Sequence, residues 1–458
     1  MYLYDILLIL KYFMQIIYFF EKYKTPLILF LEGMVSVSLQ FLFMRALLPF
    51  VGSSVGTSSI IICTFLMALA LGYHFGGSLL TNFKEKLLKN FFLASIFASI
   101  GLSPLITETY FNLIGYQANL LLAVSTYAII FMAPSVFWLG QTMPLLANLI
   151  ESDSKGKVSG TVLFFSTTGN VIGSLLTVLL LMYYFGFAFS VFLNIALLLL
   201  LIFFIEKNKK IALIKISFVG FFAWFILIQS EKIFYDHTNQ YANYKIVNEK
   251  NGDKRLISNN TDQSKLSANK TGHYYIEEIK KLINKKTISG ANVLVLGAGG
   301  FTLGHYDHQR KYTYIDIDDQ IKDFAEQKFL EEKINGTFVA SDARLFLNQN
   351  NQLWEVIVLD TFSSRAIIPS HLASIEYFNL VKSRLKKDGW FFINAILEKN
   401  FENDFSQQFN NTVLSVFKNC FIIEVDNPDN KSNKTNIIYS CIIKQNNNKI
   451  ITDKFLNF

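Results

Sequence analysis

The sequence has few charged residues and few cysteines for its length. Only 17% of its 458 residues are charged, against about 25% in an average soluble protein. Three cysteines give no disulfide framework and no zinc pattern, and we expect Cys420 and Cys441, which lie in apolar runs, to be buried thiols. This composition excludes a disordered chain, a fibrous protein and a small disulfide-stabilised domain.

The missing charge is concentrated in one half of the chain. Residues 1–230 hold 21 charged side chains, whereas the remaining 228 residues hold 56. A membrane-spanning helix needs about 20 mostly apolar residues. We therefore predict an N-terminal α-helical transmembrane bundle of seven or eight spans. The candidates lie near residues 27–49, 57–80, 91–107, 118–147, 161–184, 187–205 and 211–229, with residues 1–20 as an eighth.

Lysines mark alternate loops between these spans. They are Lys22 and Lys24, then Lys84, Lys86 and Lys89, then Lys155 and Lys157, then Lys207, Lys209 and Lys210. The positive-inside rule places such loops in the cytoplasm. If residues 211–229 span the membrane, the second half then lies outside, and Lys215 makes this the weakest span. We expect a multi-pass protein of the bacterial inner membrane. The chemistry inferred below favours a cytoplasmic soluble part, whereas the charge pattern favours the other side. The side of the soluble part is therefore ambiguous.

Four ionisable residues lie in or near the spans: Glu32, Arg45, His74 and Glu108. Such groups are functional candidates, because a charge inside a membrane is costly. A structural alternative stays open, in which Glu32 and Arg45 pair within the bundle or Arg45 extends to the membrane surface. Glycines such as Gly72 and Gly169 are typical of close helix packing.

The second half begins with a β-hairpin pattern and leads to a glycine-rich loop. Alternating runs at 244–248 and 254–258 flank Asn251-Gly252, and a helical stretch follows at 274–283. The apolar run 292–296 then leads directly into the loop 297–304. Glycines after a buried strand let a ligand approach the backbone closely.

Three further predicted strands end in acids, at Asp316, Asp342 and Asp360. Open α/β sheets bind ligands outside the carboxyl ends of their strands. Asp316 follows Gly297 at the distance where an acid binds ribose hydroxyls. The loop contains no Lys or Arg, which favours a nucleoside over a phosphate-rich cofactor. The second half has a nearly balanced charge, so we expect no nucleic-acid partner, and we expect no metal site.

The last part completes a sheet. A helix is predicted at 375–385, a turn at 387–389, and strands at 390–394, 420–425 and 437–444, the last two divided by the polar stretch 427–435. This pattern predicts a C-terminal α/β Rossmann-like sheet of class I methyltransferase type, preceded by a small β-hairpin segment. We divide the chain into residues 1–230, 231–290 and 291–458.

These motifs together resemble the spermidine synthase (polyamine aminopropyltransferase) family, and specifically its members fused to an N-terminal membrane domain. In the second half the resemblance rests on Tyr241, Gln263-Ser264, Tyr275-Ile276-Glu277, the loop 297–304, Asp316-Ile317-Asp318, Asp342-Ala343-Arg344, Asp360-Thr361-Phe362-Ser363, 369–372 and 385–389. In the first half it rests on Glu32-Gly33, Arg45 with Gly52-Ser53, 72–77, 139–144 and Thr168-Gly169-Asn170 with Gly173. The order and spacing of these motifs are more specific than any one of them.

The resemblance implies transfer of an aminopropyl group from decarboxylated S-adenosylmethionine to a small-molecule amine. A carboxylate must take the proton of the attacking amine, and by resemblance this base is Asp360, with Tyr241 supporting the amine. Asp316 would bind the ribose, and Asp342 with the Ala343 amide would bind the adenine. Gln263 and Tyr275 would flank the donor beside Gly297 and Gly299. The donor is a co-substrate, and no tightly bound cofactor is expected.

The chain departs from the family at two acidic positions. Gly300 stands where the loop usually has Asp, and Ser363 replaces the acid three residues after the base; Ile276 also replaces a His. These changes remove negative charge that would hold a polyamine, so a simple diamine acceptor is disfavoured. Two other functions stay open: a methyltransferase that uses S-adenosylmethionine, and a non-catalytic transporter or sensor that binds a nucleoside or polyamine. The other expected partner is the lipid bilayer, and a homo-oligomer stays open.

Overall fold

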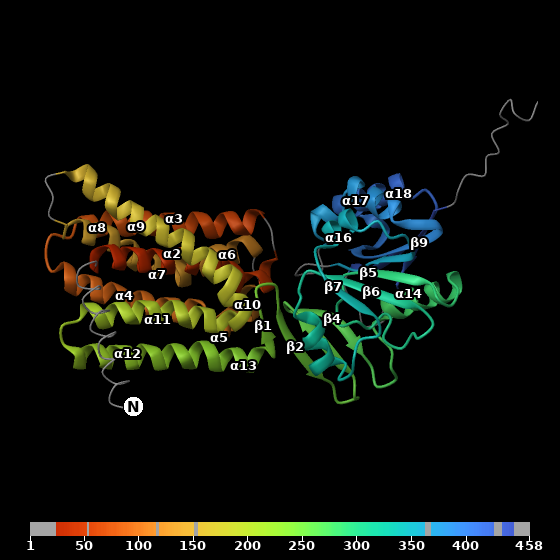
Figure 1. Cartoon of the computed structure of the whole chain (residues 1–458), viewed down its shortest axis with the longest axis horizontal. Coiled ribbons are helices and arrows are strands. Elements are labelled where there is room, and N and C mark those ends of the chain that lie inside the picture. Colours follow the sequence, from red (N-terminus) through yellow and green to blue (C-terminus); the bar gives the residue numbers. More distant parts are fainter. Residues whose placement is uncertain are drawn as a thin grey trace, which may run out of the picture. The chain divides into compact units, whose positions relative to one another are not determined.

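The structure is a computed structural model, and it describes residues 24–52, 55–115, 119–150, 154–361, 368–425 and 433–443. Residues 1–20 and Ser363 lie outside the described part. The chain divides into two compact units, Met1–Tyr244 and Lys245–Phe458 (Figure 1). The boundary falls inside the predicted segment 231–290, and the three-part division stays a prediction.

The first unit is a helical bundle. Among the described residues, six helices are long and apolar enough to cross a membrane, or up to seven with a pair that is bent by 53°. Three of the six are single helices, Lys24–Val51 (α2), Val55–Gly77 (α3) and Phe187–Ile205 (α11). The other three are Leu120–Ala147, Lys155–Phe185 and Lys209–Phe234. The first of these contains α6 (Leu120–Tyr127), α7 (Ala133–Gly140) and α8 (Thr142–Ala147), the second begins with α9 (Lys155–Leu176), and the third contains α12 (Lys209–Ala223) and α13 (Ser230–Phe234). The bent pair is Phe83–Gly101 (α4) and Pro104–Gly115, which begins with α5 (Pro104–Tyr110).

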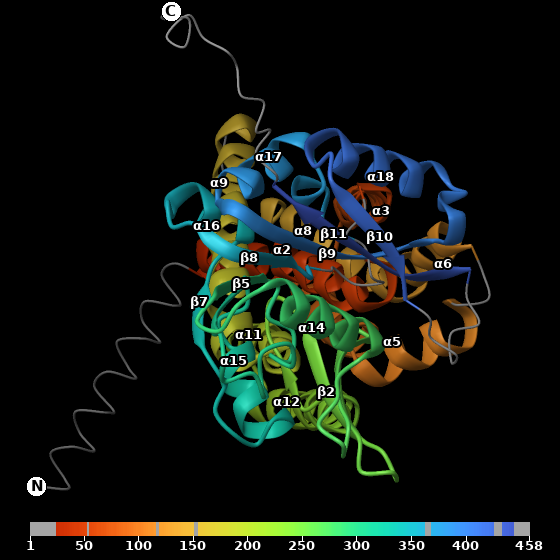
Figure 2. The ribbon, with the colours of Figure 1, turned by 90° about the vertical axis from the view of Figure 1, so that its right-hand side faces the viewer.

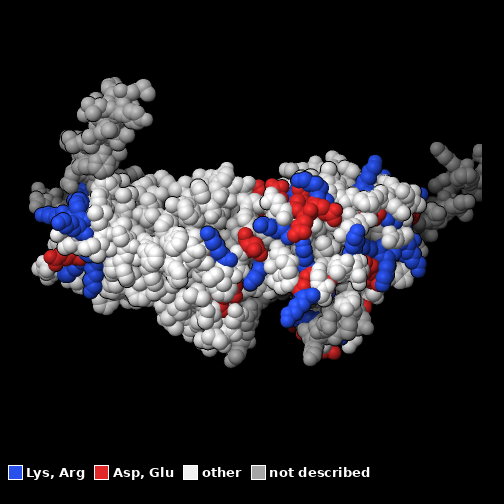
Figure 3. Space-filling model, turned by 90° about the horizontal axis from the view of Figure 1, so that it is seen from below, with Lys and Arg blue, Asp and Glu red and all other residues white. Residues whose placement is uncertain are grey.

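The ends of the bundle differ in charge. Lys84 interacts electrostatically with Lys24, Lys207 and Lys209, so three of the four predicted lysine loops meet at one end. Figure 3 shows Lys and Arg gathered there and uncharged side chains along the bundle beside them. Lys215 belongs to the same end, because its ammonium lies 3.4 Å from the Glu206 carboxylate. Its charge therefore does not count against α12 as part of a span.

The opposite end of the bundle carries a polar cluster where the chain leaves the last helix. The Arg45 guanidinium donates to the Asn239 carbonyl over 3.0 Å and to Asn243 Oδ1 over 2.7 Å. The Tyr235 hydroxyl donates to Glu108 Oε1 over 2.6 Å. The hydrogen bonds of Arg45 are thus formed at this end, and the alternative in which it pairs with Glu32 is not what the structure shows.

A small antiparallel sheet follows the bundle. Its order is β1 (His237–Thr238), β2 (Asn243–Asn248), β3 (Lys254–Ser258) and β4 (Thr261–Leu266). The predicted hairpin is confirmed as β2 and β3. Strand β4 was not predicted, because the sequence TDQSKL has no alternating apolar residues.

The second unit contains a seven-stranded sheet of order β10-β11-β9-β8-β5-β6-β7. The strands are β5 (Asn292–Leu296), β6 (Lys311–Asp316), β7 (Thr337–Ala340), β8 (Trp354–Leu359), β9 (Leu385–Glu398), β10 (Cys420–Glu424) and β11 (Lys434–Ile442). Strands β5 to β9 pair in parallel, and β11 runs antiparallel between β9 and β10. This is the predicted class I methyltransferase-type sheet.

Helices cover both faces of this sheet (Figure 2). On one face, α16 (Ala343–Gln349), α17 (Ile375–Ser383) and α18 (Asp404–Val416) bury apolar side chains against the strands. Helix α14 (Tyr274–Lys286) packs on the other face through Ile276, Ile279 and Ile283, which recur at helical spacing. The substitution of Ile for the family's His at 276 therefore supplies a core residue.

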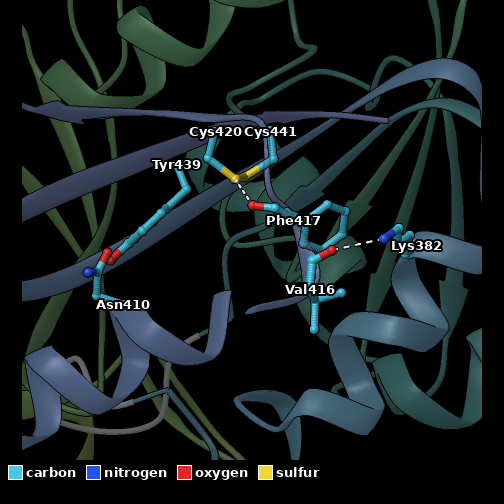
Figure 4. The surroundings of a disulfide bond; sticks show 7 residues. All are labelled: Lys382, Asn410, Val416, Phe417, Cys420, Tyr439 and Cys441. Carbon is cyan, nitrogen blue, oxygen red and sulfur yellow. Dashed lines mark hydrogen bonds between the residues drawn. A yellow bond between two sulfur atoms is a disulfide. The ribbon is translucent and has the colours of Figure 1, made fainter. Parts of the chain in front are cut away.

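Two expectations for this unit are wrong. The turn expected at 387–389 lies within β9, where Asp388 has a φ of 59° and the pairing with β8 shifts register. Cys420 and Cys441 form a disulfide rather than two thiols (Figure 4). They lie directly opposite each other on β10 and β11, with Cα atoms 4.0 Å apart. Only the register of the two strands reveals this pairing.

Candidate active site

The carboxylate of Asp360 is held by two side chains at the carboxyl end of the sheet. Its backbone N–H donates to the Leu296 carbonyl over 2.8 Å, which fixes it between β8 and β5. Asn394 Nδ2 donates to Asp360 Oδ1 over 2.8 Å, and the Tyr275 hydroxyl donates to Oδ2 over 3.1 Å. Burial raises the pKa of Asp360, while these two hydrogen bonds oppose that rise. The result is a desolvated carboxylate suited to accept a proton.

Two further side chains orient the groups around Asp360. Asn436 Nδ2 donates to Asn394 Oδ1 over 2.8 Å, which turns the amide nitrogen of Asn394 toward Asp360. The imidazole of His273 stacks on the Tyr275 ring, with centroids 5.9 Å apart and planes 15° apart. The predicted site omits both Asn394 and His273. A polar residue in the otherwise apolar run 390–394 was the available signal for Asn394.

The glycine-rich loop follows β5 and lies against Asp360. Gly297 has a φ of 94°, and a Cβ at this position would overlap the Asp360 carbonyl oxygen. The loop is also bound to β4, since the Gly300 N–H donates to Ser264 Oγ over 2.8 Å. A Cβ at Gly299 would lie 3.9 Å from Gln263 Cγ. The structure thus brings Gly297, Gly299 and Gln263 together, and their contact with a donor stays a prediction.

Asp316 ends β6 and receives backbone hydrogen bonds from two sides. The Ala298 N–H donates to Oδ2 over 3.0 Å, and the Asp318 N–H donates to Oδ1 over 3.1 Å. Burial nevertheless raises the pKa of Asp316 to about 6, although these N–H groups oppose the rise. The carboxylate is therefore tied to the glycine loop at the position predicted to bind ribose.

Asp342 and Ala343 begin α16 after β7. Asp342 Oδ1 accepts a hydrogen bond from the Leu345 N–H over 2.8 Å and so caps the helix. Its other oxygen, Oδ2, lies 3.2 Å from His371 Nε2. Asp342 thus has a structural role as the cap of α16, and its predicted contact with adenine stays a prediction.

Buried polar atoms without partners surround this edge of the sheet. Among the described residues, Gln263 Oε1 and Thr361 Oγ1 have no hydrogen-bond partner in the structure. Such atoms are rare in folded proteins and call for an explanation. A bound polar ligand would satisfy both.

The remaining predicted positions divide between the two units and the undescribed residues. Tyr241 belongs to the first unit, where its backbone N–H donates to Asn239 Oδ1 over 2.8 Å; its role beside the amine stays a prediction. At Gly300 a Cβ would lie 2.5 Å from Phe329 Cε1 and 2.9 Å from Ser264 Cβ. The loop here leaves no space for the acid usual in the family. No group of His, Cys, Asp and Glu in the described ranges could hold a metal ion.

The order of the sheet and the strand-end acids define an α/β domain of class I methyltransferase type. Residues 272–450 match the family described as Spermine/spermidine synthase domain. The chain therefore carries a domain of the spermidine synthase family, fused to apolar helices that are long enough to cross a membrane. The resemblance drawn from the motifs is confirmed at this level.

The chain is also similar to individual known proteins. Over 161 residues the chain is 27% identical to the probable polyamine aminopropyl transferase of Bifidobacterium longum (strain NCC 2705). The matched stretch covers 35% of this chain and 36% of that protein. The match thus spans about a third of the relative. Similar solved structures include a probable spermidine synthase from Corynebacterium glutamicum (18% identity, 44% of this chain and 77% of that one, TM-score 0.39). Another is the spermidine synthase from Thermotoga maritima (14% identity, 44% and 70%, TM-score 0.36).

Proposed function

We propose that the protein is a membrane-bound aminopropyltransferase that uses decarboxylated S-adenosylmethionine and an amine acceptor. The amine nitrogen attacks the aminopropyl carbon next to the sulfonium, and the carbon–sulfur bond breaks with its electron pair returning to sulfur. The products are the N-aminopropyl amine and methylthioadenosine. The proton lost by the nitrogen passes to Asp360. This balance requires no metal or redox cofactor as co-reactant.

The observation that carries the proposal is the arrangement around Asp360. A general base must be ionised before the reaction and must be able to hold a proton after it. Tyr275 and Asn394 stabilise the ionised form, whereas burial favours the protonated form. The base also adjoins Gly297, so a donor bound over the loop would present its reacting carbon near this carboxylate.

The donor is assigned to the edge formed by the glycine loop and the strand ends. Asp316 would bind the ribose hydroxyls, and its position against the Ala298 amide supports that role. Asp342 and the Ala343 amide would bind the adenine. Gln263, Gly299 and Tyr275 would flank the sulfonium side, and the unpartnered Gln263 Oε1 supports a polar contact there. Tyr241 is proposed as the support of the amine.

Transfer by the purified full-length protein in detergent micelles tests the proposal. With labelled decarboxylated donor and a panel of amines, we expect methylthioadenosine to form in proportion to an aminopropylated amine. Asp360→Asn should abolish transfer while donor binding persists, and Asp404→Asn, at an exposed acid in α18, should keep wild-type turnover. We also expect the decarboxylated donor to bind more tightly than S-adenosylmethionine. Methyl transfer from S-adenosylmethionine, or tighter binding of S-adenosylmethionine, would instead favour the methyltransferase alternative.

We also propose a location for the two units. Seven crossings after Lys24 put the lysine end of the bundle and the chain beyond Phe234 on opposite sides of a bacterial inner membrane. The positive-inside rule then places the second unit outside the cytoplasm. The Cys420–Cys441 disulfide supports the same side, because disulfides persist in oxidising compartments. This side conflicts with the expectation of a cytoplasmic site, because the adenosyl donor is made in the cytosol. A second unit outside the cytoplasm would therefore need donor that is supplied there.

A further inference from the structure

The five membrane motifs take no part in the proposed transfer site, and the structure brings together the helices that carry four of them. Helices α2 and α9 pack backbone to backbone, since a Cβ at Gly33 would overlap the Ser166 carbonyl and a Cβ at Gly169 would overlap the Phe30 carbonyl. Such close contact places the residues next to these glycines, Glu32 and Asn170, along one helix–helix seam.

The other two motifs form a second contact of the same kind. A Cβ at Gly72 would lie 2.6 Å from the Phe137 carbonyl oxygen, and a Cβ at Gly76 would lie 2.8 Å from Gln141 Cα. Helix α3 therefore packs on the junction of α7 and α8, where Thr142 begins α8. Helix α8 also touches α2 and α9, so the two seams adjoin.

Three oxygen atoms in this region are buried without partners. Glu32 is 2% exposed and Thr142 is 0% exposed. Glu32 Oε2, Thr142 Oγ1 and Asn170 Oδ1 have no hydrogen-bond partner within the part of the chain that the structure describes. They come from α2, α8 and α9, the helices that meet here. Tyr73 of α3 interacts electrostatically with Glu32.

Among the described residues, no ion pair balances the charge of Glu32. Arg45 lies 13 residues further along α2, about 20 Å along the helix axis, and bonds to Asn239 and Asn243. An uncompensated carboxylate in a membrane is costly and is by default a functional site. In the described ranges no group of three or more His, Cys, Asp and Glu could hold a metal ion, and a single carboxylate is matched in charge by a ligand with one positive charge.

We propose that Glu32, Thr142 and Asn170 form an intramembrane binding site for a primary ammonium group. An ammonium carries one positive charge and three N–H donors on one nitrogen, which match one carboxylate and three unpartnered oxygens. A proton alone would neutralise Glu32 and leave acceptors unsatisfied. The site is separate from Asp360, so this inference does not rest on the proposed transfer activity, although both sites would take amines.

Equilibrium binding of radiolabelled methylammonium to the full-length protein in detergent micelles tests the site. We expect saturable binding that Glu32→Gln weakens by about tenfold or more, because a hydrogen bond to a charged group is worth at least that factor. Thr142→Val keeps the side-chain shape and should weaken binding in the same direction. Tetramethylammonium, which has the charge but no N–H donor, should not compete.

Glu108→Gln is the matched control, because Glu108 is an acid of the bundle that already bonds to Tyr235, and it should bind methylammonium as the wild type does. Binding that both Glu32→Gln and Thr142→Val leave unchanged overturns the site, as does equal competition by tetramethylammonium. Asp360→Asn should lose transfer and keep this binding. Absence of transfer in the wild type would therefore refute the proposed function without touching the ammonium site.

Discussion

The Tyr275 hydroxyl donates a hydrogen bond to Asp360 Oδ2 over 3.1 Å. The bond links α14 to the end of β8, so a helix on one face of the sheet adjusts the basicity of a carboxylate at its edge. Burial raises the pKa of Asp360, and this hydrogen bond lowers it. The relation between the two residues thus controls the pH at which the proposed base is ionised.

Tyr275→Phe should therefore move the acidic limb of the kcat/KM profile to higher pH. Loss of a bond to the ionised form raises the pKa of Asp360 further, so more alkali is needed to ionise the base, by about one pH unit. The pH dependence of aminopropyl transfer measures this shift. Tyr274→Phe, at a neighbouring side chain that is 51% exposed, should leave the limb in place. A shift in the acidic direction would contradict the role of Tyr275.

Gly297→Ala should damage the site far more than Gly290→Ala. Both glycines have positive φ, 94° and 85°, so each substitution strains the backbone by about 1 kcal/mol. At Gly290 nothing lies within 4 Å of the added carbon, whereas at Gly297 it would overlap the Asp360 carbonyl oxygen. Overpacking adds about 1–3 kcal/mol and displaces Asp360.

Thermal unfolding and donor binding of the two variants separate these effects. Gly290→Ala should lower Tm slightly and bind donor normally, and Gly297→Ala should lose both stability and donor binding. Equal behaviour of the two variants would show that the approach of the loop to Asp360 is unimportant.

Asp316→Asn should make stability less dependent on pH while weakening donor binding. The folded state raises the pKa of Asp316 from 3.8 to about 6, so the folded protein holds a proton that the unfolded chain has lost. Stability therefore falls as pH rises from about 4 to 6 and stays lower above that range, by up to about 3 kcal/mol. The amide cannot ionise and removes this loss.

Tm measured from pH 4 to pH 7.5 on the full-length protein checks the sign. The Tm of Asp316→Asn relative to that of the wild type should rise up to about pH 6 and then level off, and Asp404→Asn controls for the change in net charge. A relative Tm that is highest at pH 4 would refute the burial argument.

The sequence predicted the site edge well because parallel strands impose it. Once β5, β6 and β8 are recognised as parallel strands, their carboxyl ends must lie at one edge of the sheet. Asp316, Asp360 and the glycine loop must then lie at that edge too. Asn394 could not be assigned in this way, because its contact with Asp360 depends on how β9 pairs with β8. The bulge at Asp388 changes that pairing, and no local residue pattern specifies it.

Long-range register also explains the error at the cysteines. Cys420 and Cys441 are 21 residues apart in sequence, and a slip of one residue between β10 and β11 would point them to opposite faces of the sheet. In the bundle, by contrast, the lysine loops and the apolar runs are local signals, and they agree with the helices of the structure. The meeting of four of the membrane motifs needed the packing of α2, α3, α8 and α9.

The number of reactive thiols tests the disulfide directly. Denatured full-length protein treated with a maleimide reagent should gain one adduct, on Cys63, without reductant and three adducts after reduction. Closing a loop of this length stabilises a fold by about 3 kcal/mol, so reduction should also lower Tm. Three adducts without reductant would return Cys420 and Cys441 to the buried thiols that the sequence suggested.

The side of the membrane is decided by reporters at two positions. Alkaline phosphatase, which is active only outside the cytoplasm, should be active when fused after Phe458, and a green fluorescent protein fused there should stay dark. Fusions after Asn208, in a lysine loop at the other end of the bundle, should give the reverse. The expected result follows from the proposed seven crossings between Lys24 and Phe234 together with the charge of the loops. A fluorescent fusion after Phe458 would place the second unit in the cytoplasm, and the disulfide would then have to form in a reducing compartment.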